Sequence, residues 1–189
     1  MKVLVAYGSR TGFTKGIAEF IGARLKERGI GAEVLEVKSV RDLSIYDAFV
    51  VGSALYMFHW MKEAKDFVMR NKTLMTKHPV WLFSSGPVGT SRTDSKGRNL
   101  LEVSGPKEID ELMEAVKALG HKVFFGGLDG SKLKGANAFW YKLAMKSEAA
   151  RKTMSEGDFR DWREIGVWAD AIAGALGARG SLSRSPGQP

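Results

Sequence analysis

Short runs of apolar residues alternate along the chain with segments that have helical spacing. Five of these runs are bounded by Gly, Ser or Pro and have the length of buried strands, and they cover residues 3–7, 32–37, 48–52, 80–84 and 123–127. Parallel strands need crossover connections, which intervening helices supply in a right-handed sense. The alternation therefore predicts an α/β fold with a doubly wound, five-stranded parallel sheet of order 2-1-3-4-5 and helices on both faces.

Apolar residues at helical spacing define the segments between these runs. Ile17, Ile21 and Leu25 recur every four residues before Gly29, which predicts a helix that ends at a glycine cap. Similar spacing predicts three further helices, around residues 64–68, over 109–119 and over 162–176. Two stretches fall outside the alternation, namely the polar loop 88–106 and the segment 128–158.

The length of the chain fits one domain. With 189 residues, of which 44% are hydrophobic, the chain can bury one sizeable core but would be cramped as two domains. We expect a single domain over residues 1–178 that contains the extra segment 128–158. Residues 179–189 lack core-forming side chains and are expected to form a disordered tail.

Composition excludes several classes of chemistry. The absence of cysteine excludes disulfides, zinc–thiolate sites, iron–sulfur clusters and cysteine nucleophiles, and it favours a reducing, cytoplasmic setting. No metal site is predicted. No stretch approaches the roughly 20 apolar residues that span a bilayer, so we expect any membrane contact to be peripheral. The 29 basic and 21 acidic residues give a net charge of +8, which favours anionic partners such as phosphates, nucleic acid or an anionic membrane face.

A loop rich in hydroxyls and glycine follows the first predicted strand. It consists of Ser9, Arg10, Thr11, Gly12, Phe13 and Thr14. Loop amides and the unpaired N–H groups of the next helix converge there on one point, and the helix dipole adds positive charge, so an anion is favoured. The loop lacks a Walker A lysine and the G-x-G-x-x-G of dinucleotide folds. A second interpretation stays open, in which the hydroxyls only cap the helix and Gly12 only turns the chain.

This loop resembles the [Ser/Thr]-x-Thr-Gly-x-Thr signature with which flavodoxins bind the phosphate of FMN. The resemblance extends over residues 1–176 and is closest to the flavodoxin-like, menaquinone-dependent protoporphyrinogen oxidases. Three features carry the closer resemblance to these oxidases: Gly52-Ser53-Ala54-Leu55-Tyr56 after the third predicted strand, Phe139-Trp140-Tyr141-Lys142 in the extra segment, and Asp161-Trp162 at the start of the last helix. The resemblance implies a flavodoxin-like fold with FMN as cofactor.

The resemblance also implies two loops that contact the flavin ring. One comprises Ser53, Ala54, Leu55 and Tyr56 along the isoalloxazine, and the other comprises Ser84, Ser85, Gly86, Pro87 and Gly89 at its pyrimidine edge. Phe58 and Trp60 either wall the ring or belong to the core, and His59 is expected at the surface. The third loop lacks the tyrosine or tryptophan that family members often stack on the ring, which would leave one face of the ring open to a substrate.

The function that the resemblance implies is an FMN-dependent oxidoreductase of the protoporphyrinogen oxidase type, acting in heme biosynthesis. Electrons would pass from a reduced substrate through FMN to menaquinone or another acceptor. The flavin would perform the redox chemistry, so no catalytic acid–base pair is assigned. Porphyrinogen and quinone are the expected partners, whereas no motif indicates a specific nucleic acid. Flavodoxin electron carriers are strongly acidic as a family, so the basic charge of this chain disfavours a carrier role.

Several alternatives stay open at this stage. The basic and aromatic residues of the segment 132–152 suit an anionic membrane surface, at the inner face of the membrane, or a carboxylated tetrapyrrole. They also suit a helix that packs on the core and exposes its lysines. The chain could also be a non-catalytic electron carrier, a protein of this fold that binds a deazaflavin, or a regulatory or nucleic-acid-binding module that has lost its flavin.

Overall fold

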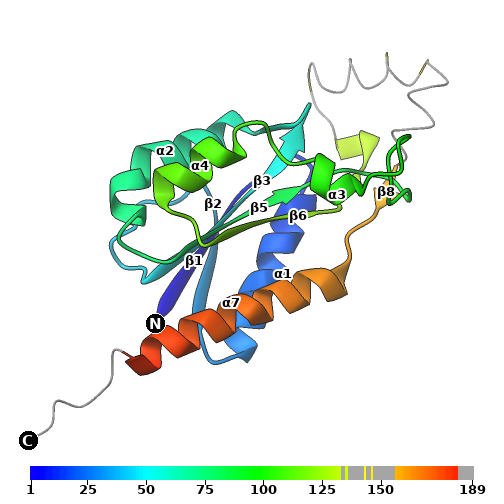
Figure 1. The fold of residues 1–189 in the computed structure, drawn as a ribbon. Coiled ribbons are helices and arrows are strands. Elements are labelled where there is room, and N and C mark those ends of the chain that lie inside the picture. Colours follow the sequence, from blue (N-terminus) through cyan, green and yellow to red (C-terminus); the bar gives the residue numbers. More distant parts are fainter. Residues whose placement is uncertain (133–134, 136–142, 144–145, 147–155, 183–189) are drawn as a thin grey trace, which may run out of the picture.

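A computed structural model describes residues 1–132, 135, 143, 146 and 156–182 (Figure 1). Its centre is a sheet of five parallel strands in the order β2-β1-β3-β5-β6. These strands are β1 (Lys2–Gly8), β2 (Gly31–Glu36), β3 (Ala48–Tyr56), β5 (Val80–Ser85) and β6 (Gly120–Phe124). The two-residue strand β4 (His59–Trp60) folds back antiparallel on β3. Without β4 the order is 2-1-3-4-5, so the predicted parallel sheet is confirmed.

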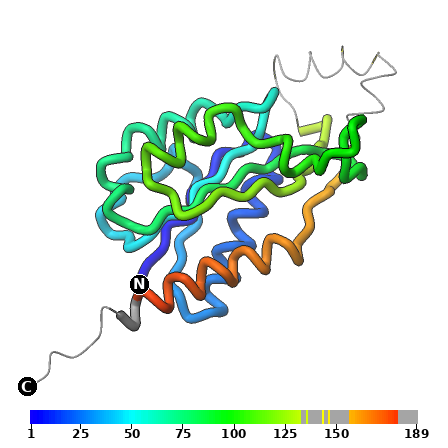
Figure 2. Tube along the Cα trace, in the orientation of Figure 1, coloured from blue at the N-terminus to red at the C-terminus, as the bar shows by residue number. Residues whose placement is uncertain are grey.

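Two pairs of helices cover the two faces of the sheet (Figures 1 and 2). The helices are α1 (Phe13–Glu27) with α7 (Trp162–Leu182), and α2 (Lys62–Met75) with α4 (Ile109–Val116). Because side chains alternate along a strand, Val3 and Val5 of β1 pack toward α1 and α7. Leu4 and Ala6 pack toward α2 and α4. Both faces of the central strand are therefore buried, as a doubly wound sheet requires.

Smaller elements lie at the end of the sheet where β5 and β6 finish (Figure 1). They are α3 (Leu100–Val103), the 3₁₀ turn Gly130–Lys132, and a ribbon of β7 (Gly127–Leu128) paired with β8 (Gly157–Asp158). The predicted loop 88–106 thus contains a short helix. Most of the extra segment 128–158 lies outside the described residues, including the aromatic stretch 139–142.

The third and fifth strands differ from the prediction at their ends. β3 continues to Tyr56 instead of ending at residue 52. β6 begins at Gly120 and ends at Phe124, whereas we expected residues 123–127. The shift arises because α4 ends at Val116, where Lys117 takes a left-handed conformation (φ 51°). The chain therefore turns into the sheet three residues earlier than the apolar pattern indicated.

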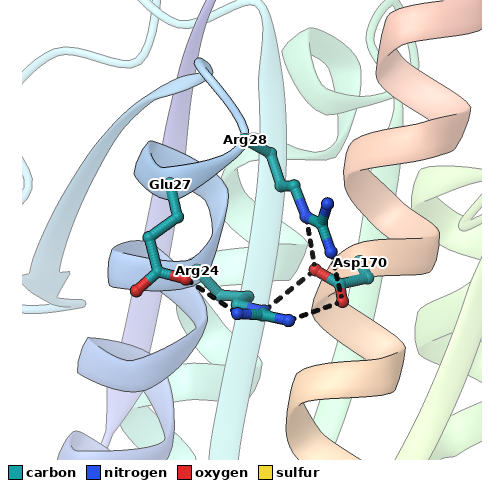
Figure 3. A network of polar contacts seen from close by, with 4 residues as sticks. All are labelled: Arg24, Glu27, Arg28 and Asp170. Atoms are coloured by element: carbon teal, nitrogen blue, oxygen red, sulfur yellow. Dashed lines mark hydrogen bonds and ion pairs between the residues drawn. The ribbon is translucent and has the colours of Figure 1, made fainter.

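The first and last helices are joined by ion pairs (Figure 3). Arg24 donates from Nε and Nη2 to Asp170, both at 3.0 Å, and Arg28 donates to the same carboxylate at 3.0 and 2.9 Å. These bonds, led by those from Arg28, hold the pKa of Asp170 at about 2. Gly29 (φ 77°) follows α1 and caps it, which confirms the predicted glycine cap.

The last helix is longer than the sequence pattern indicated. α7 continues to Leu182, so residues 179–182 are helical and the disordered tail expected from residue 179 is wrong for them; residues 183–189 lie outside the described part of the chain. Ile165, Ala169, Ile172 and Leu176 are buried along one face, as their spacing predicted. Within the described residues, no helix is both long and apolar enough to cross a membrane.

Candidate functional site

The three predicted loops leave the sheet side by side. Gly8 at the end of β1 lies opposite Ser53 of β3, and Ser53 lies opposite Ser84 of β5. Ser85 in turn lies opposite Phe124 at the end of β6. The strands that precede these loops are neighbours in the order β1-β3-β5-β6. The loops therefore meet at the carboxyl edge of the sheet, where ligands bind in folds of this topology.

The first loop presents an uncapped helix terminus. Gly12 is the N-cap of α1 with a left-handed backbone (φ 89°), and no side chain makes a capping hydrogen bond there. The Ser9 hydroxyl instead accepts the N–H of Gly12 at 3.1 Å, inside the loop. No acidic residue lies in the first turn of α1. The interpretation in which the hydroxyls cap the helix is therefore not supported, and the free N–H groups fit an anion such as a phosphate.

The space in front of this terminus is open. A Cβ built on Gly12 would have no atom within 4 Å, whereas Thr14, two residues further, is only 1% exposed. Arg10 is exposed, and its guanidinium carbon lies 4.8 Å from the centroid of the Tyr56 ring. This contact brings the first and second loops together. The ring of the predicted site residue Phe13 lies against Gly127 of β7, where it occupies the position that a Cβ on that glycine would need.

The second predicted loop is a β-hairpin, which corrects our expectation of an irregular loop from residue 53. Leu55 and Tyr56 pair with Trp60 and His59. The turn between them has two non-glycine residues with positive φ, Met57 at 51° and Phe58 at 63°. Such conformations are strained for side chains of this size and persist where the surroundings impose them.

The sequence leaves open whether Phe58 and Trp60 wall the ring or belong to the core, and the structure gives a different answer for each. Trp60 is 4% exposed and belongs to the core, whereas Phe58 is 53% exposed at the turn. Met57 beside it is 88% exposed. The apolar surface that the hairpin offers at the edge of the sheet therefore comes from Met57 and Phe58, together with the Tyr56 ring under Arg10.

Glu108, which no pattern in the sequence indicates, anchors this hairpin. Its carboxylate accepts the Trp60 N–H at 2.8 Å and lies 2.9 Å from Nδ1 of His59. The neighbouring Lys107 N–H donates to the Phe58 carbonyl at 3.0 Å. His59 is half exposed, in agreement with the expected surface position, and its Nδ1 contact with the Glu108 carboxylate leaves no pattern in the sequence.

Two predicted ring-contacting serines use their hydroxyls inside the protein. The Ser53 hydroxyl accepts the Met61 N–H at 2.9 Å and donates to the carbonyl of Ala54. The Ser84 hydroxyl lies 2.8 Å from both Trp60 Nε1 and His121 Nε2, and burial lowers the pKa of His121 to about 4. These hydroxyls therefore stabilise the site from beneath and are not free to bind a ligand.

The third loop has a fixed, open backbone. The Gly86 N–H donates to the carbonyl of Phe124 at 2.9 Å, and the Pro87 carbonyl accepts the Gly126 N–H at 2.8 Å. Gly86 and Gly89 have positive φ values of 132° and 116°, and a Cβ on Gly89 would meet nothing within 4 Å. The loop is thus held at residues 86–87 and is open around Gly89, while the predicted site residue Ser85 is 6% exposed.

Two arginines at this edge stack on aromatic rings. Arg10 lies over Tyr56, and the guanidinium carbon of Arg92 lies 4.2 Å from the centroid of the Phe125 ring. Among the residues that the structure describes, neither forms a salt bridge with a carboxylate. An arginine stacked in this way keeps its N–H groups available around the rim of the guanidinium plane. The site can therefore offer two cations to an anionic ligand.

Comparison with known proteins agrees with the fold. Residues 4–155 match the family model described as flavodoxin domain. The chain is 27% identical over 182 residues to a protein of Escherichia coli K12 named protoporphyrinogen IX dehydrogenase [quinone], a match that covers 92% of this chain and 95% of the relative.

Solved structures show the same fold at lower identity. A flavodoxin from the domain Archaea is 18% identical with a TM-score of 0.54, covering 93% of this chain and 99% of that one. The rubredoxin oxygen:oxidoreductase of Desulfovibrio gigas is 16% identical with a TM-score of 0.57, covering 94% of this chain. This chain spans only 36% of the latter protein, so that likeness concerns one part of it.

Proposed function

This chain belongs to the flavodoxin family, and on that premise we propose that it is an FMN-dependent oxidoreductase that passes electrons from a reduced substrate through FMN to a quinone or similar acceptor. The observation that carries the proposal is the uncapped first turn of α1, with Gly12 in a left-handed conformation at the open carboxyl edge of the sheet. FMN, when bound, supplies the redox chemistry, and the protein supplies placement and electrostatics.

The residues at this edge have separate tasks in the proposal. The loop amides and the hydroxyls of Thr11 and Thr14 would hold the phosphate, helped by the dipole of α1. The Tyr56 side chain and the backbone around Gly89 would bound the ring, because the first lies at the end of β3 and the second is open. Met57 and Phe58 would add apolar surface beside them. A flat, largely apolar ring needs walls of this kind.

Two observations support a carboxylated substrate of the protoporphyrinogen type. The E. coli relative is named for protoporphyrinogen IX and a quinone, and the match covers nearly the full length of both chains. Arg10 and Arg92 lie at the carboxyl edge and form no salt bridge within the described residues. Guanidinium groups recognise carboxylates with paired N–H donors, so the two arginines could receive the acidic side chains of a tetrapyrrole.

The proposal is tested in two steps. The purified protein is first mixed with FMN, and bound flavin is detected by its visible spectrum after gel filtration. Turnover is then measured anaerobically with protoporphyrinogen as reductant and a soluble menaquinone analogue as acceptor. We expect bound FMN and quinone-dependent oxidation of the porphyrinogen. Bound FMN without turnover would identify an electron carrier, and a protein that retains no flavin would contradict the whole proposal.

A further inference from the structure

The β7–β8 ribbon brings a distant arginine to the first turn of α1. Gly127 and Leu128 pair with Asp158 and Gly157, and the N–H of Phe159 donates to the Gly126 carbonyl at 3.0 Å. The next residue, Arg160, donates from Nη1 to the carbonyl of Phe13 at 3.1 Å. The two residues are 147 positions apart in the sequence. The end of the extra segment therefore contacts the loop that we propose to bind the FMN phosphate.

Arg160 is held firmly in this position. Its guanidinium carbon lies 5.1 Å from the centroid of the Phe13 ring and 4.3 Å from that of Trp162. Asp158 accepts its Nε–H at 2.7 Å and pairs with Nη2 as well. The side chain is only 13% exposed. A guanidinium fixed by two aromatic rings and one carboxylate loses little further freedom when it binds the carbonyl.

Because Gly16 has no side chain, Arg160 can occupy the space beside it. A Cβ on Gly16 would lie 2.3 Å from Nη1 of Arg160, which is far inside van der Waals contact. Glycine is unfavourable inside a helix compared with alanine, and Gly16 lies within α1. A glycine here therefore has a packing role, and a larger residue would displace the guanidinium without removing its charge.

We propose that Arg160 is a positioning residue for the phosphate of the flavin, acting through the peptide that joins Phe13 to Thr14. The inference rests on the proposed FMN site. The carbonyl of Phe13 and the N–H of Thr14 belong to one planar trans peptide, so they point in opposite directions. Arg160 binds the carbonyl, which fixes this plane and polarises it. The Thr14 N–H at the other side then faces the anion site as a stronger donor.

This arrangement links the extra segment to the cofactor. The ribbon carries Asp158 and leads directly to Arg160, so docking of the ribbon on α1 sets the phosphate-binding turn. By thermodynamic reciprocity, a bound phosphate favours the docked ribbon as much as the docked ribbon favours the phosphate. Flavins with and without a phosphate should therefore respond differently to changes at Arg160.

The experiment compares FMN with riboflavin, which has the same ring without the phosphate. Dissociation constants for both are measured by quenching of flavin fluorescence, using the full chain and the variants Arg160→Met, Gly16→Ala and the double variant. We expect Arg160→Met to weaken FMN binding about tenfold and to leave riboflavin binding unchanged. Gly16→Ala should have a similar effect because it displaces Arg160, and the double variant should lose no more than either single variant.

Matched controls separate this effect from general changes in charge or helix stability. Arg163→Met removes an exposed arginine nearby on α7, and Gly174→Ala replaces a helical glycine whose Cβ would meet nothing within 4 Å. Both controls should bind FMN as the unchanged protein does. Equal losses for FMN and riboflavin, or unchanged FMN binding in Arg160→Met and Gly16→Ala, would overturn the inference alone. An unchanged protein that binds no FMN would overturn the proposed function as well.

Discussion

Serine residues at the carboxyl edge serve different purposes according to where their side chains point. Ser9 lies on the loop after β1, and its hydroxyl accepts the Gly12 N–H. Ser84 lies in β5 and is fully buried, where its hydroxyl joins the indole N–H of Trp60 to His121. A buried indole N–H needs a partner, since an unpaired donor in the interior is costly. Ser84 is therefore a structural residue beneath the site.

Replacing Ser84 tests this role. We expect Ser84→Ala to lower the free energy of unfolding by about 1–3 kcal/mol, because the Trp60 N–H would lose its acceptor. Urea denaturation followed by tryptophan fluorescence measures the change. Ser95→Ala, at an exposed position, is the matched control and should change stability by less than about 0.5 kcal/mol. Equal stability of the two variants would show that the Ser84 hydroxyl contributes nothing.

His121 gives the same network a dependence on pH. Burial lowers its pKa to about 4, whereas the group titrates at 6.5 when unperturbed. Between pH 6.5 and pH 4 this histidine is protonated in the unfolded chain and neutral in the folded protein. The free energy of unfolding therefore falls as the pH drops from 6.5 toward 4. Denaturation of the unchanged protein and of His121→Gln across this range measures the effect. The stability advantage of the unchanged protein should shrink toward low pH, and parallel curves would contradict the assignment.

At the scale of elements, the β3–β4 hairpin combines a strained turn with firm anchors. Met57 and Phe58 have positive φ values and expose apolar side chains, while Glu108 and the Lys107 N–H hold the strand that follows. Two-residue hairpin turns of this kind favour Asn and Gly, because these residues tolerate left-handed backbone. The chain therefore keeps bulky residues at a cost in stability, as is common at functional sites.

The double variant Met57→Asn/Phe58→Gly should separate stability from function. We expect the free energy of unfolding to rise by about 1 kcal/mol, because the turn is relieved of strain. Flavin affinity and turnover should fall, since the apolar surface beside the ring is lost. Denaturation and fluorescence titration measure the two effects. Ile45→Asn, which removes another exposed apolar side chain before β3, is the control and should leave flavin affinity unchanged. A less stable double variant would contradict the assigned strain.

The sheet and the first loop could be predicted because their signals are contiguous in the sequence. Buried parallel strands leave apolar runs, and residues 9–14 form one unbroken motif. The hairpin could not be predicted, because Met57 and Phe58 are not turn-forming residues and the anchor Glu108 follows 48 positions after Trp60. The contact of Arg160 with Phe13 spans 147 positions and leaves no local pattern. Only the folded chain reveals such pairs.

At the scale of the whole molecule, the arrangement of charge matters more than its sum. The chain carries +8, yet two cations at the carboxyl edge are paired: Lys132 with Asp129, and Arg160 with Asp158. Arg10 forms no salt bridge within the described residues, and it lies beside the β3–β4 hairpin, over the Tyr56 ring. A cation placed in this way attracts an anionic ligand to one edge of the sheet, and the attraction weakens with added salt.

Two double variants with the same change in charge test whether position decides the effect. Arg10→Gln/Arg92→Gln removes two charges at the carboxyl edge, and Arg41→Gln/Lys77→Gln removes two exposed charges that precede β3 and β5 at the opposite edge. With a dicarboxylated porphyrinogen we expect the first pair to lower kcat/KM by about tenfold or more, because each arginine can make a charge-assisted hydrogen bond to a carboxylate. The second pair should have little effect.

The salt dependence of kcat/KM gives a second measurement of the same attraction. The Debye length shortens from about 30 Å at 0.01 M salt to about 8 Å at 0.15 M, so removing the first pair of charges should also weaken this salt dependence. Equal losses for both pairs would show that net charge alone attracts the substrate, and that neither arginine receives a carboxylate.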